Sequence, residues 1–285
     1  MTVLQALRRT HRDLLLAGCP DAMVDAEMLL CTATGWKRHR LYLDGDRELG
    51  PDSAAELERM LGRRRAREPL QHIIGEVGFL DSTIITTPSA LIPRPETEAL
   101  VELLATALSG TQPALILDLG TGAGPIAVSV AARFPRAMIV ATDVSIRAIE
   151  LARQNLARNG VENVQLVVCS MLDALRARFD ALVANPPYVP TALIEQLEPE
   201  VRLGDPRIAL DGGPDGLRVL SHIAGCACSA IRPGGVLALE TGEGQSALVA
   251  GMLSREGCWE DVRLGSDLAG THRFVMARRL RDAKN

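Results

Sequence analysis

The sequence predicts an α/β fold in which a doubly wound parallel sheet follows a small helical domain. From residue 114 onward, short and almost entirely apolar segments alternate with amphipathic ones. This pattern is typical of parallel strands whose two faces are covered by helices. The first 75 residues show only helical periodicity, and a chain of 285 residues has room for both parts.

Residues 1–75 are predicted to form a separate helical domain with three main helices. Leucines recur at helical spacing in the first, the second ends at Gly35, and the third begins near Pro51, which suits the first turn of a helix. The third helix ends in the arginine-rich stretch 63–67. We favour a solvated helix end there, and contact with an acidic or RNA-containing partner is the alternative.

Residues 76–95 are predicted to form a β-hairpin and a linker. The stretch 77–87 is dense in threonine and isoleucine, and Asp81-Ser82 can turn the chain. Pro93 and Pro95 hold the next segment extended, and Glu96 and Glu98 then open a helix. The second domain is therefore expected to span residues 96–285.

The predicted sheet has five strands, separated in most cases by helices. The strands lie at residues 114–120, 138–143, 164–169, 180–185 and 236–240, and the helices at 123–134, 145–159 and 215–231. Ser145 suits the N-cap of the middle helix, and Gly160 suits its end.

The first predicted strand runs into a glycine-rich turn, DLGTGAG, at residues 118–124. Its GxGxG spacing differs from the GxGxxG of dinucleotide-binding proteins. The acidic residue at the strand end suits a ligand with a cationic amino-acid part, and the carboxylate that ends the second strand can accept both hydroxyls of a ribose. These features favour S-adenosylmethionine over NAD, with the following residues expected to bind it: Asp118, Gly120, Thr121, Gly122, Ala123, Gly124 and Asp143.

The fourth predicted strand ends in NPPY, residues 185–188, and should lie beside the first, facing the methyl donor. This sequence suits a planar nitrogen nucleophile. The side-chain oxygen of Asn185 and the carbonyl of Pro186 can accept its two hydrogens and direct its lone pair at the methyl group. The prolines stiffen the backbone, and Tyr188 can stack on the flat substrate group. A Pro-Pro turn alone would explain Pro186 and Pro187 but not Asn185 together with Tyr188.

Composition excludes several other classes of protein. The net charge of −4 argues against a wide basic surface, and we expect no sequence-specific nucleic-acid binding. The N-terminus lacks the features of a secretory signal, and no apolar run reaches about 18 residues, so we expect a cytoplasmic protein with no membrane span. The six scattered cysteines form no CxxC pair, so we expect reduced thiols, no metal and no disulfide.

Six stretches together carry a resemblance that covers nearly the whole chain. They are REPLQHIIGE (67–76), LIPRPETE (91–98), DLGTGAG (118–124), NPPYVP (185–190), ALDGGPDGL (209–217) and RPGGVLALETG (232–242). The sequence resembles the HemK/PrmC family of protein-(glutamine-N) methyltransferases. NPPY is shared with DNA and RNA amino-methyltransferases, whereas LIPRPETE combined with ALDGG is specific to this family.

The resemblance implies a class I S-adenosylmethionine-dependent methyltransferase fold, which is Rossmann-like, with an N-terminal domain that helps to grip the substrate. It implies methylation of the glutamine side-chain amide, at N5, in the Gly-Gly-Gln motif of class I peptide chain release factors. Met171 and Asn185 would join the methyl-donor site, although core packing is an alternative for Met171. The glutamine site would comprise Asn185, Pro186, Pro187 and Tyr188, bordered by Arg94 and Glu96. We expect a monomer.

The chain departs from the usual family pattern at three places. Leu80-Asp81 replaces an aromatic residue and glycine, Ser170-Met171 replaces an acidic and an aromatic residue, and Gly204-Asp205-Pro206 replaces Phe-Glu-Pro. These departures affect the expected adenine pocket and the substrate-side loops.

Several functions therefore stay open. One alternative is a paralogue that methylates another protein glutamine or a small-molecule amide or amine. A DNA adenine amino-methyltransferase is disfavoured by the acidic pI of 5.8 and by the absence of a recognisable target-reading motif. A cofactor-binding module without catalysis is disfavoured by the intact NPPY stretch.

Overall fold

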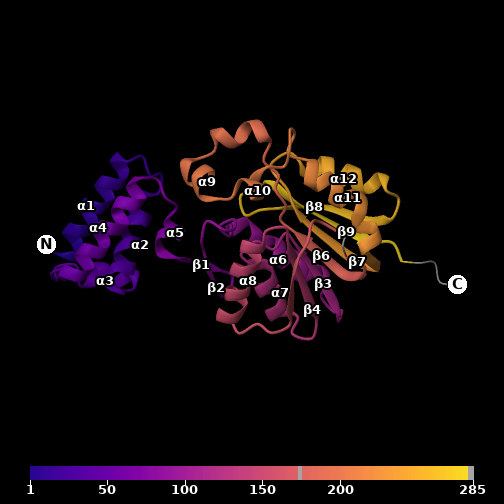
Figure 1. Cartoon of the computed structure of the whole chain (residues 1–285), viewed down its shortest axis with the longest axis horizontal. Coiled ribbons are helices and arrows are strands. Elements are labelled where there is room, and N and C mark those ends of the chain that lie inside the picture. The colour runs from indigo at the N-terminus through magenta and orange to yellow at the C-terminus, as the bar shows by residue number, and fades with distance from the viewer. Residues whose placement is uncertain (173–174, 282–285) are drawn as a thin grey trace. The chain divides into compact units, whose positions relative to one another are not determined.

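The computed structural model describes residues 1–172 and 175–281 (Figure 1). The chain divides into two compact units. The helical unit contains Met1–Gly75 and Glu198–Gly204, and the sheet unit contains Glu76–Leu197 and the residues from Asp205 onward. The short segment Glu198–Gly204 thus belongs to the helical unit, although its neighbours in sequence belong to the sheet unit. No helix within the described residues is long and apolar enough to cross a membrane.

The helical unit contains more helices than the three that the sequence predicts. Its elements are α1 (Val3–Leu16), α2 (Ala22–Thr34), α3 (Arg38–Leu43), α4 (Pro51–Arg65), α5 (Leu70–Ile74) and α9 (Pro199–Gly204). A capping box begins α1, in which Thr2 and Gln5 each accept a hydrogen bond from the other's backbone N–H. Leu14, Leu29 and Leu57 bring α1, α2 and α4 together in one buried core.

Arginines near the end of α4 form ion pairs inside the helical unit. The Arg64 side chain is 5% exposed and donates to Asp25 Oδ2 and Glu200 Oε1, each at 2.7 Å. Arg67 donates to both carboxylate oxygens of Glu200, at 2.6 and 2.7 Å. The expectation of a solvated helix end was wrong for these two residues, because their acidic partners come from α2 and α9 and leave no local pattern.

The hairpin and the helix after it confirm the predictions for this region. Strands β1 (Glu76–Phe79) and β2 (Ser82–Ile85) pair antiparallel, with Phe79 opposite Ser82. Leu80, in the turn, has a φ of 48°, a conformation that favours glycine. Helix α6 (Pro95–Ala107) begins at a proline and carries acidic residues in its first turn.

A seven-stranded sheet forms the centre of the sheet unit. Its strands are β3 (Leu115–Leu119), β4 (Met138–Asp143), β5 (Val164–Val168), β6 (Phe179–Ala184), β7 (Ile231–Glu240), β8 (Trp259–Ser266) and β9 (His272–Arg279), in the order β5-β4-β3-β6-β7-β9-β8. Strands β3 to β7 are parallel, and β9 is antiparallel to both β7 and β8. The five predicted strands are confirmed. The sequence did not reveal β8 and β9, because β8 is an edge strand with mostly exposed side chains and lacks an apolar run.

Helices cover both faces of this sheet (Figure 1). The bounds of the remaining helices are α7 (Pro125–Arg133), α8 (Ile146–Arg158), η1 (Thr191–Gln196), α10 (Arg207–Leu210), α11 (Arg218–Ala230) and α12 (Ser246–Arg255). On one face, α6, α7 and α8 share a core with Ile116 and Val236. On the other, α11 and α12 share a core with Leu117 and Leu237. Neighbouring residues of a strand point to opposite faces, so burial of both faces requires continuous apolar strands.

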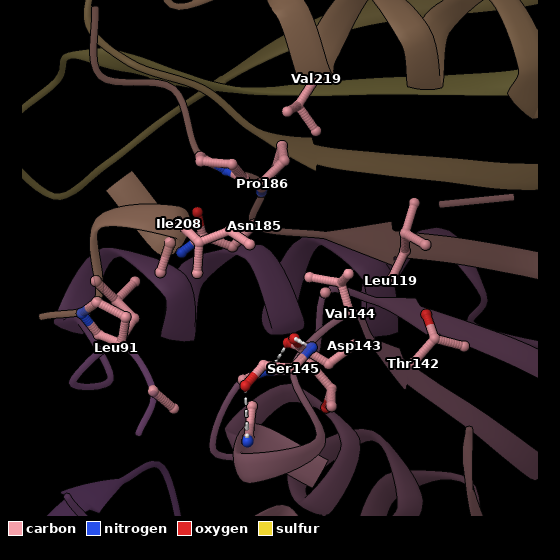
Figure 2. A pocket seen from close by; sticks show the side chains of 18 of the residues that line it. Leu91, Leu119, Thr142, Asp143, Val144, Ser145, Asn185, Pro186, Ile208 and Val219 are labelled. Atoms are coloured by element: carbon pink, nitrogen blue, oxygen red, sulfur yellow. Dashed lines mark hydrogen bonds between the residues drawn. The ribbon is translucent and has the colours of Figure 1, made fainter. Parts of the chain in front are cut away.

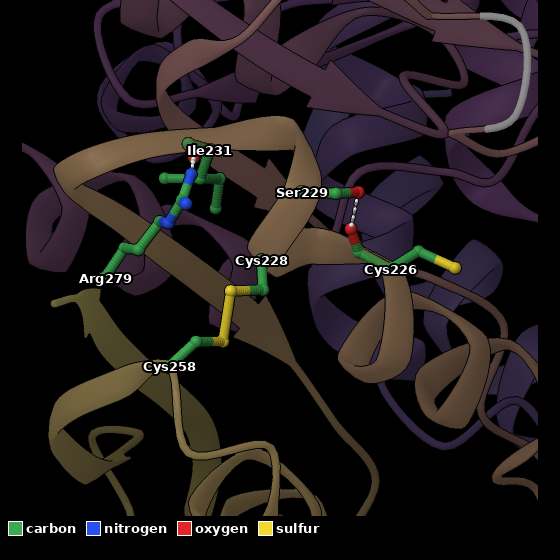
Figure 3. Close-up of a disulfide and its surroundings, with 6 residues drawn as sticks. All are labelled: Cys226, Cys228, Ser229, Ile231, Cys258 and Arg279. Atoms are coloured by element: carbon green, nitrogen blue, oxygen red, sulfur yellow. Dashed lines mark hydrogen bonds between the residues drawn. A yellow bond between two sulfur atoms is a disulfide. The ribbon is translucent and has the colours of Figure 1, made fainter. Parts of the chain in front are cut away.

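The cysteines depart from expectation in one respect. Cys228 of α11 and Cys258, directly before β8, form a disulfide with their Cα atoms 6.5 Å apart (Figure 3). The expectation of no disulfide was wrong because the two cysteines are 30 residues apart and meet only when α11 packs near β8. The four other cysteines are free. Among the described residues, no group of three or more His, Cys, Asp or Glu side chains could hold a metal ion.

Candidate active site

A cavity of about 330 Å³ opens at the carboxyl ends of β3, β4, β5 and β6. This is the switch point of the sheet, because the chain continues from β3 toward β5 on one side and toward β7 on the other. Figure 2 shows Asp143 and Ser145 at the end of one strand and Asn185 and Pro186 at the end of another. The lining includes Arg94, Thr97, Gly120, Thr121, Gly122, Ala123, Asp143, Met171, Asn185, Pro186 and Pro187.

The glycine-rich loop presents its backbone to this cavity. Its three glycines have φ values between 57° and 87°, which other residues rarely adopt. The N–H groups of Gly120 and Thr121 donate to the Thr142 carbonyl at 2.8 and 2.7 Å, which ties the loop to β4. A Cβ on Gly124 would lie 3.2 Å from the Cβ of Ala152, whereas a Cβ on Gly120 would meet nothing within 4 Å. Gly120 therefore leaves open space in which a ligand can approach the main chain.

Asp143 joins the glycine-rich loop to the start of α8. Its Oδ2 accepts from the N–H of Gly122 at 2.9 Å and its Oδ1 from the N–H of Ser145 at 2.8 Å. Ser145 in turn accepts from the N–H of Ala148 and so caps α8, as predicted. Burial raises the pKa of Asp143, and the two N–H donors oppose that change. The carboxylate is thereby held in one orientation at the cavity wall.

Asp118 supports the loop from behind. It is fully buried and does not line the cavity, and its Oδ2 accepts from the Thr121 hydroxyl at 2.6 Å. Burial raises the pKa of Asp118 to about 7, against the lowering effect of the Thr121 hydrogen bond. Direct contact between Asp118 and a cationic ligand group therefore stays a prediction.

The segment after β5 forms another wall of the cavity. Cys169, Ser170 and Met171 line it, where the sequence predicts the adenine ring. Met171 has a φ of 50°, which is uncommon for a residue other than glycine. Met171 also packs against the buried cluster under α11. Both interpretations of this side chain, as a ligand wall and as part of the core, therefore have a structural basis.

Asn185 follows β6 directly and lines the cavity. Its side-chain nitrogen Nδ2 donates to Thr97 Oγ1, from α6, at 3.0 Å. The Nδ2 atom is thus engaged within the protein, and the other amide atom, Oδ1, is left to accept a hydrogen bond from a ligand.

Tyr188 follows the two prolines of NPPY and contacts the end of β7. It is not among the residues that line the cavity. Its hydroxyl donates to Glu240 Oε1 at 3.5 Å, and a Cβ on Gly242 would lie 3.2 Å from Tyr188 Cδ2. The ring therefore packs beside the end of β7, and stacking on a substrate stays a prediction.

The ALDGG stretch holds the backbone that follows NPPY. The N–H of Val189 donates to the Leu210 carbonyl and the N–H of Gly212 to the Val189 carbonyl, both at 2.9 Å. A Cβ on Gly216 would fall 2.3 Å from the Tyr188 carbonyl oxygen, so a larger residue would displace the loop. Both stretches stand out in the sequence, but no local pattern shows that they pair.

Arg94 and Glu96 differ in their relation to the cavity. Arg94 lines it and forms an ion pair with Asp205, whose other oxygen accepts from the N–H of Ile92 at 3.0 Å. Burial raises the pKa of Asp205, and the Arg94 charge opposes that change. Glu96 does not line the cavity. In the sequence, Asp205 stands out only as a departure from the family pattern, yet its carboxylate positions Arg94.

The fold and the cavity define the class of protein. The chain matches the PrmC N-terminal domain over residues 5–75 and the methyltransferase small domain over residues 94–196. It is similar in fold to the crystal structure of a methyltransferase from Pyrococcus furiosus, with a TM-score of 0.52 and 17% identity over 80% of this chain and 99% of that one. The protein is therefore a methyltransferase with the Rossmann-like fold that the sequence predicts.

Two relatives then establish the family. A release factor glutamine methyltransferase of Geobacter sulfurreducens is 41% identical over 97% of this chain and 96% of its own length. One from Deinococcus radiodurans is 40% identical over 98% of this chain and 99% of its own length. The chain belongs to the release factor glutamine methyltransferase family, which confirms the resemblance found in the sequence.

Proposed function

We propose that this chain transfers a methyl group from S-adenosylmethionine to N5 of the glutamine in the Gly-Gly-Gln motif of class I peptide chain release factors. The names of the two relatives support a release factor as the substrate. The observation that carries the proposal is the Asn185 amide. Its nitrogen is bound to Thr97 and its oxygen is left for a ligand, in the same cavity as the glycine-rich loop.

The cavity has the groups that S-adenosylmethionine requires. The open backbone at Gly120 would accommodate its amino-acid part, the fixed carboxylate of Asp143 would accept from its ribose hydroxyls, and Met171 would lie against its adenine. The bound molecule would supply an electrophilic methyl group on its sulfonium and would leave as the thioether S-adenosylhomocysteine, while the methylated nitrogen would lose one of its two protons to water. Asp118 and Thr121 would contribute by keeping the loop in shape.

Asn185 and Pro186 would then hold the glutamine. An amide nitrogen is a poor nucleophile because its lone pair is delocalised into the carbonyl. Acceptance of its two hydrogens by Asn185 Oδ1 and the Pro186 carbonyl would orient the NH2 group and offset the positive charge that develops on nitrogen. Pro187 would stiffen this segment, and Arg94, held by Asp205, would border the substrate.

The helical unit would help to grip the release factor, and the enzyme would act as a monomer in the cytoplasm. Arg65, on the last turn of α4, is exposed and is the arginine of the 63–67 stretch best suited to such a contact. Arg64 and Arg67 already form ion pairs with Glu200.

Methyl transfer to purified release factors tests the proposal. The enzyme is incubated with methyl-labelled S-adenosylmethionine and either a class I release factor or the same factor with alanine in place of the Gly-Gly-Gln glutamine. We expect label only in the unchanged factor, located on the glutamine by mass spectrometry. Equal labelling of the alanine variant would indicate another target, and absence of label from both would contradict the proposal. A parallel incubation with DNA tests the adenine alternative.

A further inference from the structure

A chain of two hydrogen bonds links Asn185 through Thr97 to Glu240, the last residue of β7. Asn185 Nδ2 donates to Thr97 Oγ1 at 3.0 Å, and the Thr97 hydroxyl donates to Glu240 Oε2 at 2.8 Å. The exposed fraction of Thr97 is 3% and that of Glu240 is 1%, so water has little access to either. Tyr188 donates to the other carboxylate oxygen, Oε1. Glu240 thus accepts hydrogen bonds from two hydroxyl groups, which belong to two different segments of the site.

The carboxylate fixes the direction of the whole chain. An ionised carboxylate only accepts hydrogen bonds, so the single hydrogen of the Thr97 hydroxyl must point to Glu240. The Thr97 oxygen is then an acceptor and selects the NH2 end of the Asn185 amide. The two ends of an amide have nearly the same shape, and the surrounding hydrogen bonds alone determine which one faces a ligand.

We propose that Glu240 and Thr97 are positioning residues that orient the Asn185 amide with its oxygen toward the substrate NH2 group. This inference rests on the proposed function, because it assigns the orientation that a glutamine amide requires. A proton on Glu240 would reverse the chain: the acid would donate to Thr97, Thr97 would donate to the Asn185 oxygen, and the Asn185 NH2 would face the substrate NH2. Two donors cannot pair, so the protonated enzyme would hold its substrate poorly.

The surroundings of Glu240 place this switch near neutral pH. Burial raises the pKa of Glu240 to about 7, against the lowering effect of the Thr97 hydrogen bond. Of the charged groups nearby, Glu96 of α6 also raises the pKa and Arg273 of β9 lowers it, as does the hydrogen bond from Tyr188. Burial raises the pKa of Tyr188 to about 12, so its hydroxyl keeps the proton that it donates. Turnover should therefore fall as the pH drops below about 7.

The test compares Thr97→Val, which removes the hydroxyl at nearly constant shape, with Thr97→Ser, which keeps it. We expect Thr97→Val to lower kcat about 10-fold at pH 8 while the Kd for S-adenosylmethionine changes little. Thr97→Ser should keep most of the wild-type kcat. Glu240→Gln should remove the fall in kcat below pH 7, because the amide does not titrate. Ser129→Ala, which removes a buried hydroxyl of α7 outside the cavity, serves as the matched control.

An unchanged kcat in Thr97→Val would overturn the proposal. So would a kcat of Thr97→Ser as low as that of Thr97→Val, or a fall in kcat below pH 7 that persists in Glu240→Gln. NMR of the Asn185 side-chain NH2 provides a second measurement that needs no substrate. Its signals should shift with a midpoint near pH 7 in the wild type and stay constant in Glu240→Gln and Thr97→Val. If the wild type labelled no release factor but showed this titration, the proposed function would fail and the orienting chain would stand.

Discussion

Gly204 illustrates how close packing within the helical unit requires a small residue at one position. A Cβ at this position would lie 2.3 Å from Pro69 Cγ, within the helical unit. The aromatic residue that the family usually has here could not fit unless the backbone moved. The packing of α9 against Pro69 therefore excludes a larger side chain at Gly204.

Replacement of Gly204 by alanine should destabilise the protein. We expect the free energy of unfolding to fall by about 1–3 kcal/mol, because the new methyl group overlaps a rigid proline ring. Gly62→Ala is the matched control, since Gly62 is exposed within α4 and a Cβ there would meet nothing within 4 Å. It should instead raise stability by about 0.5–1 kcal/mol, through higher helix propensity. Thermal unfolding of both variants measures the difference, and a neutral Gly204→Ala would contradict this assignment.

At the scale of elements, α9 depends on buried charges. Glu200 accepts hydrogen bonds from Arg64 and Arg67, and its side chain is 16% exposed. Partial burial alone would raise the pKa of Glu200, but the Arg67 and Arg64 hydrogen bonds outweigh that effect and lower the pKa to about 2. Because this helix has only six residues, its position depends on these contacts more than on its own propensity.

Glu200→Gln should therefore cost about 3 kcal/mol of stability at neutral pH, because it removes the carboxylate that Arg64 and Arg67 share and leaves only Asp25 and Glu198 to pair with them. The ionised group has its full stabilising effect above its ordinary pKa of 4.5 and loses it as the pH falls toward about 2. The difference in free energy of unfolding between the wild type and the variant should thus become smaller as the pH falls. Glu56→Gln, at an exposed pair with Arg59, is the control and should leave the free energy of unfolding nearly unchanged, because solvent screens that pair. Similar effects of both variants in urea unfolding would refute the role of Glu200.

Local patterns in the sequence predicted most elements of this molecule. The strands β3 to β7, the hairpin and α6 were predictable because burial of both sheet faces and acidic helix starts mark short stretches of sequence. Strand β8 was not predictable because its exposed edge carries no apolar run. The assignment of α9 to the helical unit was also hidden, since Arg64 and Glu200 are 136 residues apart.

At the scale of the whole molecule, some residues of the cavity belong to local sequence motifs, whereas others meet only when distant segments pack together. The glycine-rich loop, Asp143 and Asn185 stand out as motifs at strand ends, and the sheet order brings them to one cavity. Their supports do not stand out. Thr97 and Glu240 are separated by 143 residues and meet only because α6 packs beside the end of β7. Reaction type is therefore visible in the sequence, and the orientation of the reacting groups requires the fold.

The role of Asn185 in holding the substrate amide is tested most directly by single-turnover methyl transfer in Asn185→Ala. The labelled methyl group on a class I release factor is measured beside the Kd of the variant for S-adenosylmethionine. We predict a rate about 100-fold lower or more, with the Kd much less affected, because the lost acceptor acts mainly on the reacting nitrogen. An unchanged rate, or a loss explained entirely by weaker binding of S-adenosylmethionine, would contradict that role.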